Sequence, residues 1–222
     1  MAINAAEEET IESLKKWWDE NGKQLILAVV LIVAGYGGWS AWEGAKTASS
    51  DAASDLYEEI LGLGVVEPGQ VLSDENRDTI ISLAAELRDE HSDTIYARYG
   101  SLFSAQQYAM TGNLDGAETA LRWIVDNPLE GLFVESDEGL LLTANLRLAR
   151  VLLSKGDHEA ALATISSMAP KEFEAGYAEL QGDVYVAMGR IVEARESYLA
   201  AQQAGSSSDG LRMKLDNVSE DS

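Results

Sequence analysis

An uncharged run from Gln24 to Trp42 constrains this chain more than any other feature of its sequence. The run is 19 residues long and contains neither acidic nor basic side chains. At about 1.5 Å per residue, a helix of this length spans roughly 28 Å, which is close to the hydrocarbon thickness of a bilayer. The alternative is a core helix of a soluble protein, which would need apolar cover on every side. The sequence therefore predicts a single transmembrane helix over residues 24–42.

Lysines are distributed unevenly around this span. Three of them precede it, at positions 15, 16 and 23, whereas only Lys46 follows closely. The positive-inside rule therefore predicts a cytoplasmic N-terminal segment, residues 1–23, and an outer domain, residues 43–222. A cleaved signal peptide is the alternative, but the apolar run is longer than a usual signal core and no small-x-small cleavage site follows it. Trp39 and Trp42 suit the outer aromatic belt of a membrane helix.

Two further patterns accompany the span. Small residues recur along it at helical spacing and predict a face where another helix packs closely: Ala34, Gly37, Gly38, Ala41 and Ala45. The alternative is the ordinary tolerance of membrane helices for glycine. Before the span, residues 7–20 predict a short amphipathic helix with Ile11, Leu14, Trp17 and Trp18 on one side. We expect this helix to lie at the inner interface and to end at Asn21-Gly22.

The composition argues against several functions. The net charge is −22, from 38 acidic and 16 basic residues, so the surface repels nucleic acids and anionic lipids and suits basic or unfolded protein clients. The chain has no cysteine, which excludes disulfides and thiolate chemistry. Its two histidines, His91 and His158, lie far apart and lack the neighbours of a zinc site or a catalytic triad. We predict no catalytic, cofactor-binding or metal-binding residues, and no enzymatic activity.

Beyond the span, the sequence predicts helices throughout. The membrane helix is expected to continue into a first outer helix that buries Leu56, Tyr57, Ile60 and Leu61 and ends at Gly62-Leu-Gly64. A loop containing Pro68-Gly69 follows. Ser73 then caps a second helix, and a third runs from near Asp93 to Met110.

A Gly-x₄-Ala motif occurs three times in the second half, each time between two helical patterns. Its glycines are Gly112, Gly156 and Gly189, and its alanines are Ala117, Ala161 and Ala194. The glycine is expected to end one helix, and the alanine to lie where the two helices cross. The alanines are 44 and 33 residues apart, and the second interval matches a tetratricopeptide repeat of about 34 residues. The first interval indicates an insertion of about ten residues within Asn127–Ser136.

The third copy resembles a tetratricopeptide repeat best because it has Gly182 in its first helix, where the earlier copies have Ala105 and Ala149. Its helices are predicted over Lys171–Met188, opened by Pro170, and from Ile191 to about Gln203. After Gly205-Ser-Ser-Ser, a short terminal helix is predicted to cover the open end of the stack with four apolar residues: Leu211, Met213, Leu215 and Val218. The predicted fold class is therefore all-α, with a transmembrane helix, a tetratricopeptide-repeat-like solenoid and a C-terminal capping helix.

The first helices of such repeats line a concave face, which we predict to bind proteins. The candidate groove residues are Tyr99, Leu102, Gln106 and Met110, then Leu146, Arg150 and Leu153, then Glu179, Asp183 and Val186. The alternative is that several of them are core residues. Some tetratricopeptide proteins hold a partner's C-terminal carboxylate with a cluster of Lys, Arg and Asn. Arg150 alone, expected beside Glu179 and Asp183, does not make such a cluster.

Several motifs together resemble one known family. The chain has Lys-Trp-Trp-x-Glu-Asn-Gly-Lys at residues 16–23, Trp39-x-x-Trp42, the degenerate repeats, and Met213-Lys-Leu-Asp-Asn near its end. This combination resembles the YfgM family of bacterial inner-membrane proteins, which are ancillary subunits of the SecYEG translocon. The resemblance implies a periplasmic repeat domain, association with SecYEG and a PpiD-like chaperone, and passage of translocating or unfolded proteins to periplasmic chaperones. The alternative is a tethered scaffold or regulator of an envelope stress response that acts through the cytoplasmic segment.

Overall fold

The structure of this chain is a computed structural model that describes residues 2–65, 72–129 and 137–220. All regular elements within these ranges are helical, so the predicted all-α class is confirmed. The helices are α1 (Ala2–Gly64), α2 (Asp74–Glu90), α3 (Ile95–Met110), α4 (Leu114–Asp126), α5 (Glu138–Lys155), α6 (His158–Ser166), the 3₁₀ turn η1 (Lys171–Phe173), α7 (Glu174–Ala187), α8 (Ile191–Gln203) and α9 (Asp209–Glu220). The chain forms two units, an N-terminal unit, Met1–Asp51, and a repeat unit, Ala52–Ser222.

Helix α1 runs through Asn21 and Gly22, so the predicted helix end at these residues is wrong. The side-chain amide of Asn21 donates a hydrogen bond to the carbonyl of Trp17 at 3.1 Å, within the helix. Gly22 is buried beneath the Trp18 indole, and a Cβ atom there would lie 3.1 Å from the ring. The glycine therefore allows a close aromatic approach instead of breaking the helix.

The segment Glu9–Gly64 contains a stretch long and apolar enough to cross a membrane, and none of that stretch is buried within the described structure. Apolar side chains are exposed both before and inside it, including Leu14, Ile32 and Trp39. A long apolar surface without protein cover is expected of a helix whose solvent is lipid.

The last turns of α1 pack against α2 and α3 in the repeat unit. Ala53 and Ile60 of α1 contact a small core that includes Ile80, Leu87 and Ala97. The predicted continuation of α1 to Gly64 is therefore confirmed, but the predicted burial of Leu61 is wrong, because 40% of this residue is exposed. Leu63 packs against this core instead. The predicted Pro68-Gly69 loop lies outside the described residues.

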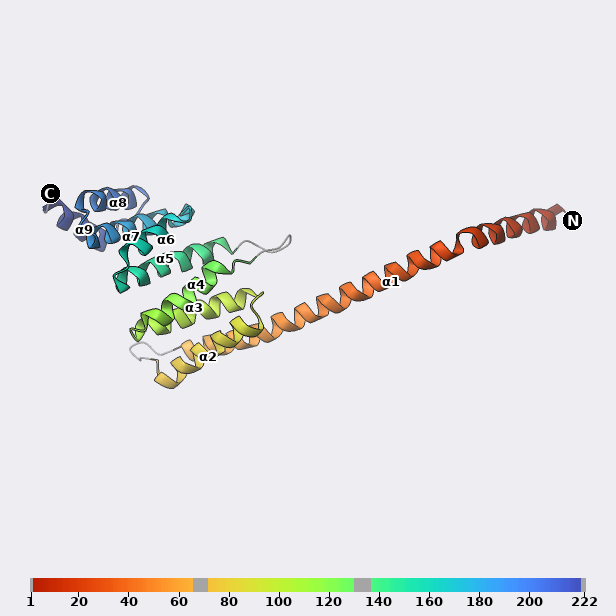
Figure 1. Cartoon of the computed structure of the whole chain (residues 1–222), viewed down its shortest axis with the longest axis horizontal. Coiled ribbons are helices and arrows are strands. Elements are labelled where there is room, and N and C mark those ends of the chain that lie inside the picture. Colours follow the sequence, from red (N-terminus) through yellow and green to blue (C-terminus); the bar gives the residue numbers. More distant parts are fainter. Residues whose placement is uncertain (1, 66–71, 130–136, 221–222) are drawn as a thin grey trace. The chain divides into compact units, whose positions relative to one another are not determined.

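The three Gly-x₄-Ala motifs form the helix junctions that the sequence predicts (Figure 1). Gly112, Gly156 and Gly189 adopt positive φ angles of 76°, 82° and 73°, which only glycine adopts at little cost. Ala117, Ala161 and Ala194 are fully buried. The glycines thus reverse the chain, and the small alanines allow the paired helices to cross closely.

The third repeat differs from its prediction at one end. Lys171 has a φ of 45°, outside the right-handed helical region, so an α-helix does not begin there. Residues 171–173 form the 3₁₀ turn and α7 begins at Glu174, whereas a single helix over Lys171–Met188 was predicted. Helix α8 has the predicted bounds. In the capping helix α9, Leu211 and Val218 are buried as predicted, but Met213 is 64% exposed.

Candidate protein-binding surface

The predicted groove residues lie on α3, α5 and α7, the first helices of the three repeats. Leu102 and Leu146 belong to the main core cluster and are only 9% and 8% exposed, so they offer little surface to a partner. Tyr99, Met110 and Val186 are exposed. Glu179 and Asp183 are half-buried.

The structure brings two of the predicted residues, Gln106 and Arg150, into one pocket. This pocket has a volume of about 310 Å³. It lies over α4 and between α3 and α5, and its lining comes from all three helices: Ala105, Gln106 and Ala109 of α3, Leu121 of α4, and Arg147, Arg150 and Val151 of α5. Its floor is apolar, because Ala105, Leu121 and Val151 are buried members of the core.

The pocket has a cationic rim. Arg147 and Arg150 are both exposed, and neither guanidinium makes an ion pair or hydrogen bond to any described residue. Sequence reasoning had singled out Arg150 and missed Arg147. The missed signal was its spacing, because residues three apart on a helix share a face.

The opposite arrangement occurs on α7. Lys214 of the capping helix lies 2.9 Å from a Glu179 carboxylate oxygen and 2.7 Å from one of Asp183. The hydroxyl of Tyr198 also donates to Asp183, at 2.9 Å. These two acids therefore pair with Lys214 of the capping helix. The sequence analysis expected them beside Arg150 and did not identify Lys214 as their partner. Burial disfavours the charge of Lys214, but the hydrogen bonds to both acids outweigh it and raise the pKa of this amine.

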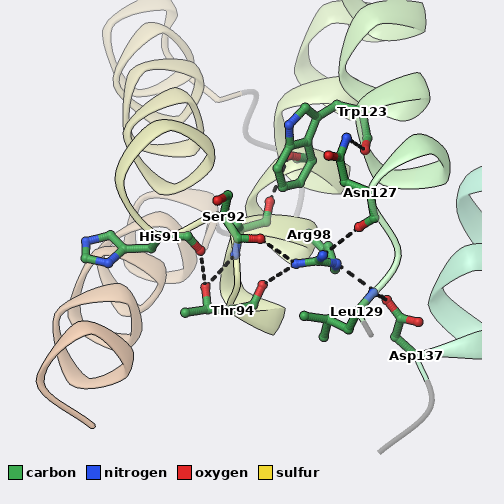
Figure 2. Close-up of polar contacts among 10 residues, drawn as sticks. His91, Ser92, Thr94, Arg98, Trp123, Asn127, Leu129 and Asp137 are labelled. Atoms are coloured by element: carbon green, nitrogen blue, oxygen red, sulfur yellow. Dashed lines mark hydrogen bonds and ion pairs between the residues drawn. The ribbon is translucent and has the colours of Figure 1, made fainter. Parts of the chain in front are cut away.

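Another arginine, Arg98 of α3, has a structural role (Figure 2). It is 2% exposed. Three backbone carbonyls accept hydrogen bonds from its guanidinium: Ser92 at 2.9 Å, Thr94 at 2.8 Å and Asn127 at 2.5 Å. Its Nε lies 3.5 Å from a carboxylate oxygen of Asp137, and its guanidinium lies over the Trp123 ring. Burial lowers the pKa of Arg98, while Asp137 and Asp93 oppose that shift.

Arg98 thereby fixes both described ends of the inserted loop. Asn127 precedes residues 130–136, which the structure does not describe, and Asp137 follows them. Asp137 also accepts a hydrogen bond from the backbone of Leu129 at 3.2 Å. The described contacts of this buried cation are to backbone carbonyls, Asp137 and the Trp123 ring, so Arg98 organises the loop.

The remaining candidate features are simpler. Ala34, Gly37, Gly38, Ala41 and Ala45 all lie on the exposed part of α1. A Cβ atom added at Gly37 or Gly38 would have no described atom within 4 Å, so the face is open to an approaching helix. His91 follows the end of α2 and His158 begins α6. Among the described residues, no group of three or more histidine or carboxylate side chains could hold a metal ion.

Comparisons with known proteins cover almost the whole chain. A family model described as a tetratricopeptide repeat-like domain matches residues 15–220. The ancillary SecYEG translocon subunit of Haemophilus influenzae is 31% identical over 220 residues, 98% of this chain and 100% of that protein. The Escherichia coli protein of the same name is 29% identical over 222 residues, 99% of this chain and 100% of that protein. The chain matches no solved structure.

Proposed function

Because the chain belongs to the YfgM family of tetratricopeptide repeat-like proteins, we propose that it is an inner-membrane adaptor of the SecYEG translocon. The observation that carries the proposal is similarity along the full length of relatives with that name. Both units of the chain are therefore matched, the N-terminal helix as well as the repeats. The proposed role is protein binding without catalysis.

In the proposed topology, residues 1–23 are cytoplasmic, residues 24–42 cross the membrane, and residues 43–222 lie in the periplasm. The lysines before the span and the long uncovered apolar stretch of α1 support this arrangement. The exposed apolar side chains of Ile11, Leu14, Trp17 and Trp18 suit the inner membrane interface.

The proposed action is to hold the repeat unit where newly translocated proteins emerge and to help pass them to a PpiD-like periplasmic chaperone. Tethering raises the local concentration of the repeat unit near the emerging proteins, so weak contacts are sufficient. The exposed groove residues on α3 and α5, such as Tyr99, Gln106 and Arg150, are the proposed contacts with these proteins. The small-residue face of α1 is the proposed contact with translocon or chaperone helices.

A photo-crosslinking experiment tests this placement. Crosslinkers at Gly37 and Ala41 are expected to capture translocon or chaperone helices. A crosslinker at Ile32, about 140° around the helix from Gly37, is the matched control and is expected to give far less of this product. Capture of lipid alone, or only of further copies of this chain, counts against the proposal.

The alternative function is regulation through the cytoplasmic segment, and the exposed apolar side chains of this segment, which begin at Ile11, favour it. If this alternative holds, deletion of residues 1–13 is expected to abolish the function of the protein in the cell, whereas replacement of the repeats is not. The adaptor proposal expects the reverse. Affinity purification of both variants from detergent-solubilised membranes shows which variant still co-purifies with the translocon.

A further inference from the structure

Some basic side chains of the repeat unit form ion pairs and others do not. In a chain with 38 acidic and 16 basic residues, a basic side chain usually has a carboxylate nearby, and Arg77, Arg98, Lys155 and Lys214 all have one. Among the described residues of this unit, four arginines make no ion pair: Arg88, Arg147, Arg150 and Arg195. Two of these four line the same pocket. Two guanidinium groups that could each bind an anion therefore lie next to each other at one pocket.

The shape of this pocket complements the two charges. Arg147 and Arg150 lie one helical turn apart on α5, with Gln106 of α3 as a further hydrogen-bond donor in the lining. The floor is formed by Ala105, Leu121 and Val151. A volume of about 310 Å³ is at the lower end for ligand sites, so it suits one or two side chains of a larger molecule. An apolar side chain fits the floor while a carboxylate meets the rim.

We propose that this pocket binds an acidic peptide segment of another protein, with an internal Asp or Glu side chain held by Arg147 and Arg150. An apolar neighbour in the peptide contacts the floor. The inference rests on the proposed function in one respect, namely that the occupant is a client or partner of the adaptor. Guanidinium groups bind carboxylates with paired, charge-assisted hydrogen bonds, which makes two adjacent arginines a specific receptor.

The surrounding charge decides which anions are accepted. The net charge of −22 repels extended polyanions such as nucleic acid or an anionic membrane, whereas one or two carboxylates can reach a local pair of cations. On α7 the corresponding surface is closed, because Lys214 binds Glu179 and Asp183. Because the arginines are exposed at the rim, a chain can cross the pocket without ending there. An internal side chain is therefore the expected ligand.

The test uses the full chain in nanodiscs of uncharged phosphatidylcholine. The probe is a fluorescein-labelled peptide with both ends blocked and an internal Leu-Glu-Leu-Glu sequence, and its binding is followed by fluorescence anisotropy. Replacing both cations, Arg147→Gln with Arg150→Gln, is expected to weaken binding about tenfold or more, since hydrogen bonds to charged groups are strong. The Arg147→Lys/Arg150→Lys variant keeps the charge and is expected to fall between, because lysine lacks the bidentate fork.

The matched control replaces two other unpaired arginines, Arg88→Gln with Arg195→Gln, and changes the net charge equally. It is expected to leave binding within about twofold, because these charges act only at a distance. Wild-type chain that fails to bind the peptide overturns the proposal. So does equal binding of a peptide with Gln in place of Glu, or equal loss in the control variant.

Two further probes separate other anions. A peptide without Glu but with a free C-terminal carboxylate is expected to bind weakly, and tight binding would reassign the pocket to chain ends. Arginine-dependent binding to anionic vesicles would reassign it to membranes. If the peptide binds through the arginines while crosslinks from Gly37 miss the translocon, the peptide-binding proposal is supported and the adaptor proposal is contradicted. If the crosslinks reach the translocon but the peptide does not bind, only the peptide-binding proposal is contradicted.

Discussion

The first two repeats and the third repeat use the same junction motif but present different surfaces. In all three, a glycine reverses the chain and a buried alanine lies at the helix crossing. Six residues before that glycine, the repeats have Gln106, Arg150 and Asp183 in turn. Gln106 and Arg150 line an open pocket, whereas Asp183 is bound by the capping helix. The backbone of a repeat therefore determines where these positions lie, and neighbouring elements determine whether they are available.

Two parts of the repeat unit, the inserted loop and the capping helix, also differ in how each uses one cation. Arg98 is almost fully buried and joins α3 to both described ends of the inserted loop. Lys214 is partly exposed and joins α9 to α7. Both make several polar contacts. Removing one partner of a buried ion pair lowers the free energy of unfolding far more than removing one partner of an exposed pair, because the remaining charge stays buried without a counter-charge.

The largest effect is expected from Arg98→Met. The change leaves Asp137 buried without its cation and removes three hydrogen bonds to carbonyls, so we expect a loss of about 3–5 kcal/mol in the free energy of unfolding. Urea unfolding of the full chain in detergent measures it. Arg122→Met is the control, because Arg122 is largely exposed and Glu118, its partner, keeps a second cation in Lys155, so the loss is expected to be about 0–1 kcal/mol. A loss of the same size in both variants would contradict the importance of burial.

Gly182→Ala tests the packing difference between the repeats. A methyl group at this position collides with the Tyr198 ring, and such overpacking costs about 1–3 kcal/mol. The first repeat has Ala105 at the equivalent position, with Leu121 in place of the tyrosine. Adding Tyr198→Leu to Gly182→Ala is therefore expected to recover part of the lost stability. Simple additivity of the two changes in a double-mutant cycle would contradict a direct clash.

Local sequence signals predicted much of this fold. The turn glycines, the crossing alanines and the bounds of α8 follow from spacing within one repeat. The break predicted at Gly22 failed because an interior glycine costs only about 1 kcal/mol relative to alanine. Interrupting the helix beside an apolar run would instead leave backbone groups unpaired.

The candidate site could be predicted only in part. Gln106 and Arg150 were identified from the repeat register, but Leu102 and Leu146 face the core. The pairing of Lys214 with Glu179 and Asp183 spans 35 and 31 residues along the chain. Arg98 and Asp137 are likewise joined across the inserted loop. Such contacts depend on how α9 and the loop pack, which local periodicity does not specify.

Lys214→Gln is expected to have a smaller effect than the two changes above. It leaves Glu179 and Asp183 close together without their cation and weakens the attachment of α9 by about 1 kcal/mol, since the lysine is partly exposed. Hydrogen exchange is expected to increase in α9 and to remain unchanged in α3 and α4. Arg212→Gln, in an exposed pair with Asp209, is the control with little expected change. Equal hydrogen exchange in both variants would contradict a role of Lys214 in attaching α9 to α7.

An effect of similar size, and the one most dependent on pH, is expected where the second repeat meets the third. The hydroxyl of Tyr177 in α7 lies 2.9 Å from the Leu142 carbonyl and 3.1 Å from the Asn145 amide oxygen, both in α5. Tyr177→Phe removes this donor and is expected to cost about 1 kcal/mol at neutral pH. Thermal unfolding of the full chain in detergent measures the difference.

The same residue predicts how that difference changes in alkali. Burial raises the pKa of Tyr177 to about 12 from the ordinary tyrosine value of 10.0, so the folded state favours the neutral phenol. This contribution is complete below about pH 10 and is lost as the pH rises toward 12, because the unfolded chain then releases the proton first. Tyr177→Phe lacks that linkage, so the stability curves of the two proteins should converge above about pH 10 and then cross. Curves that stay parallel from pH 9 to 12 would place the Tyr177 hydroxyl in water and remove it from the junction between α5 and α7.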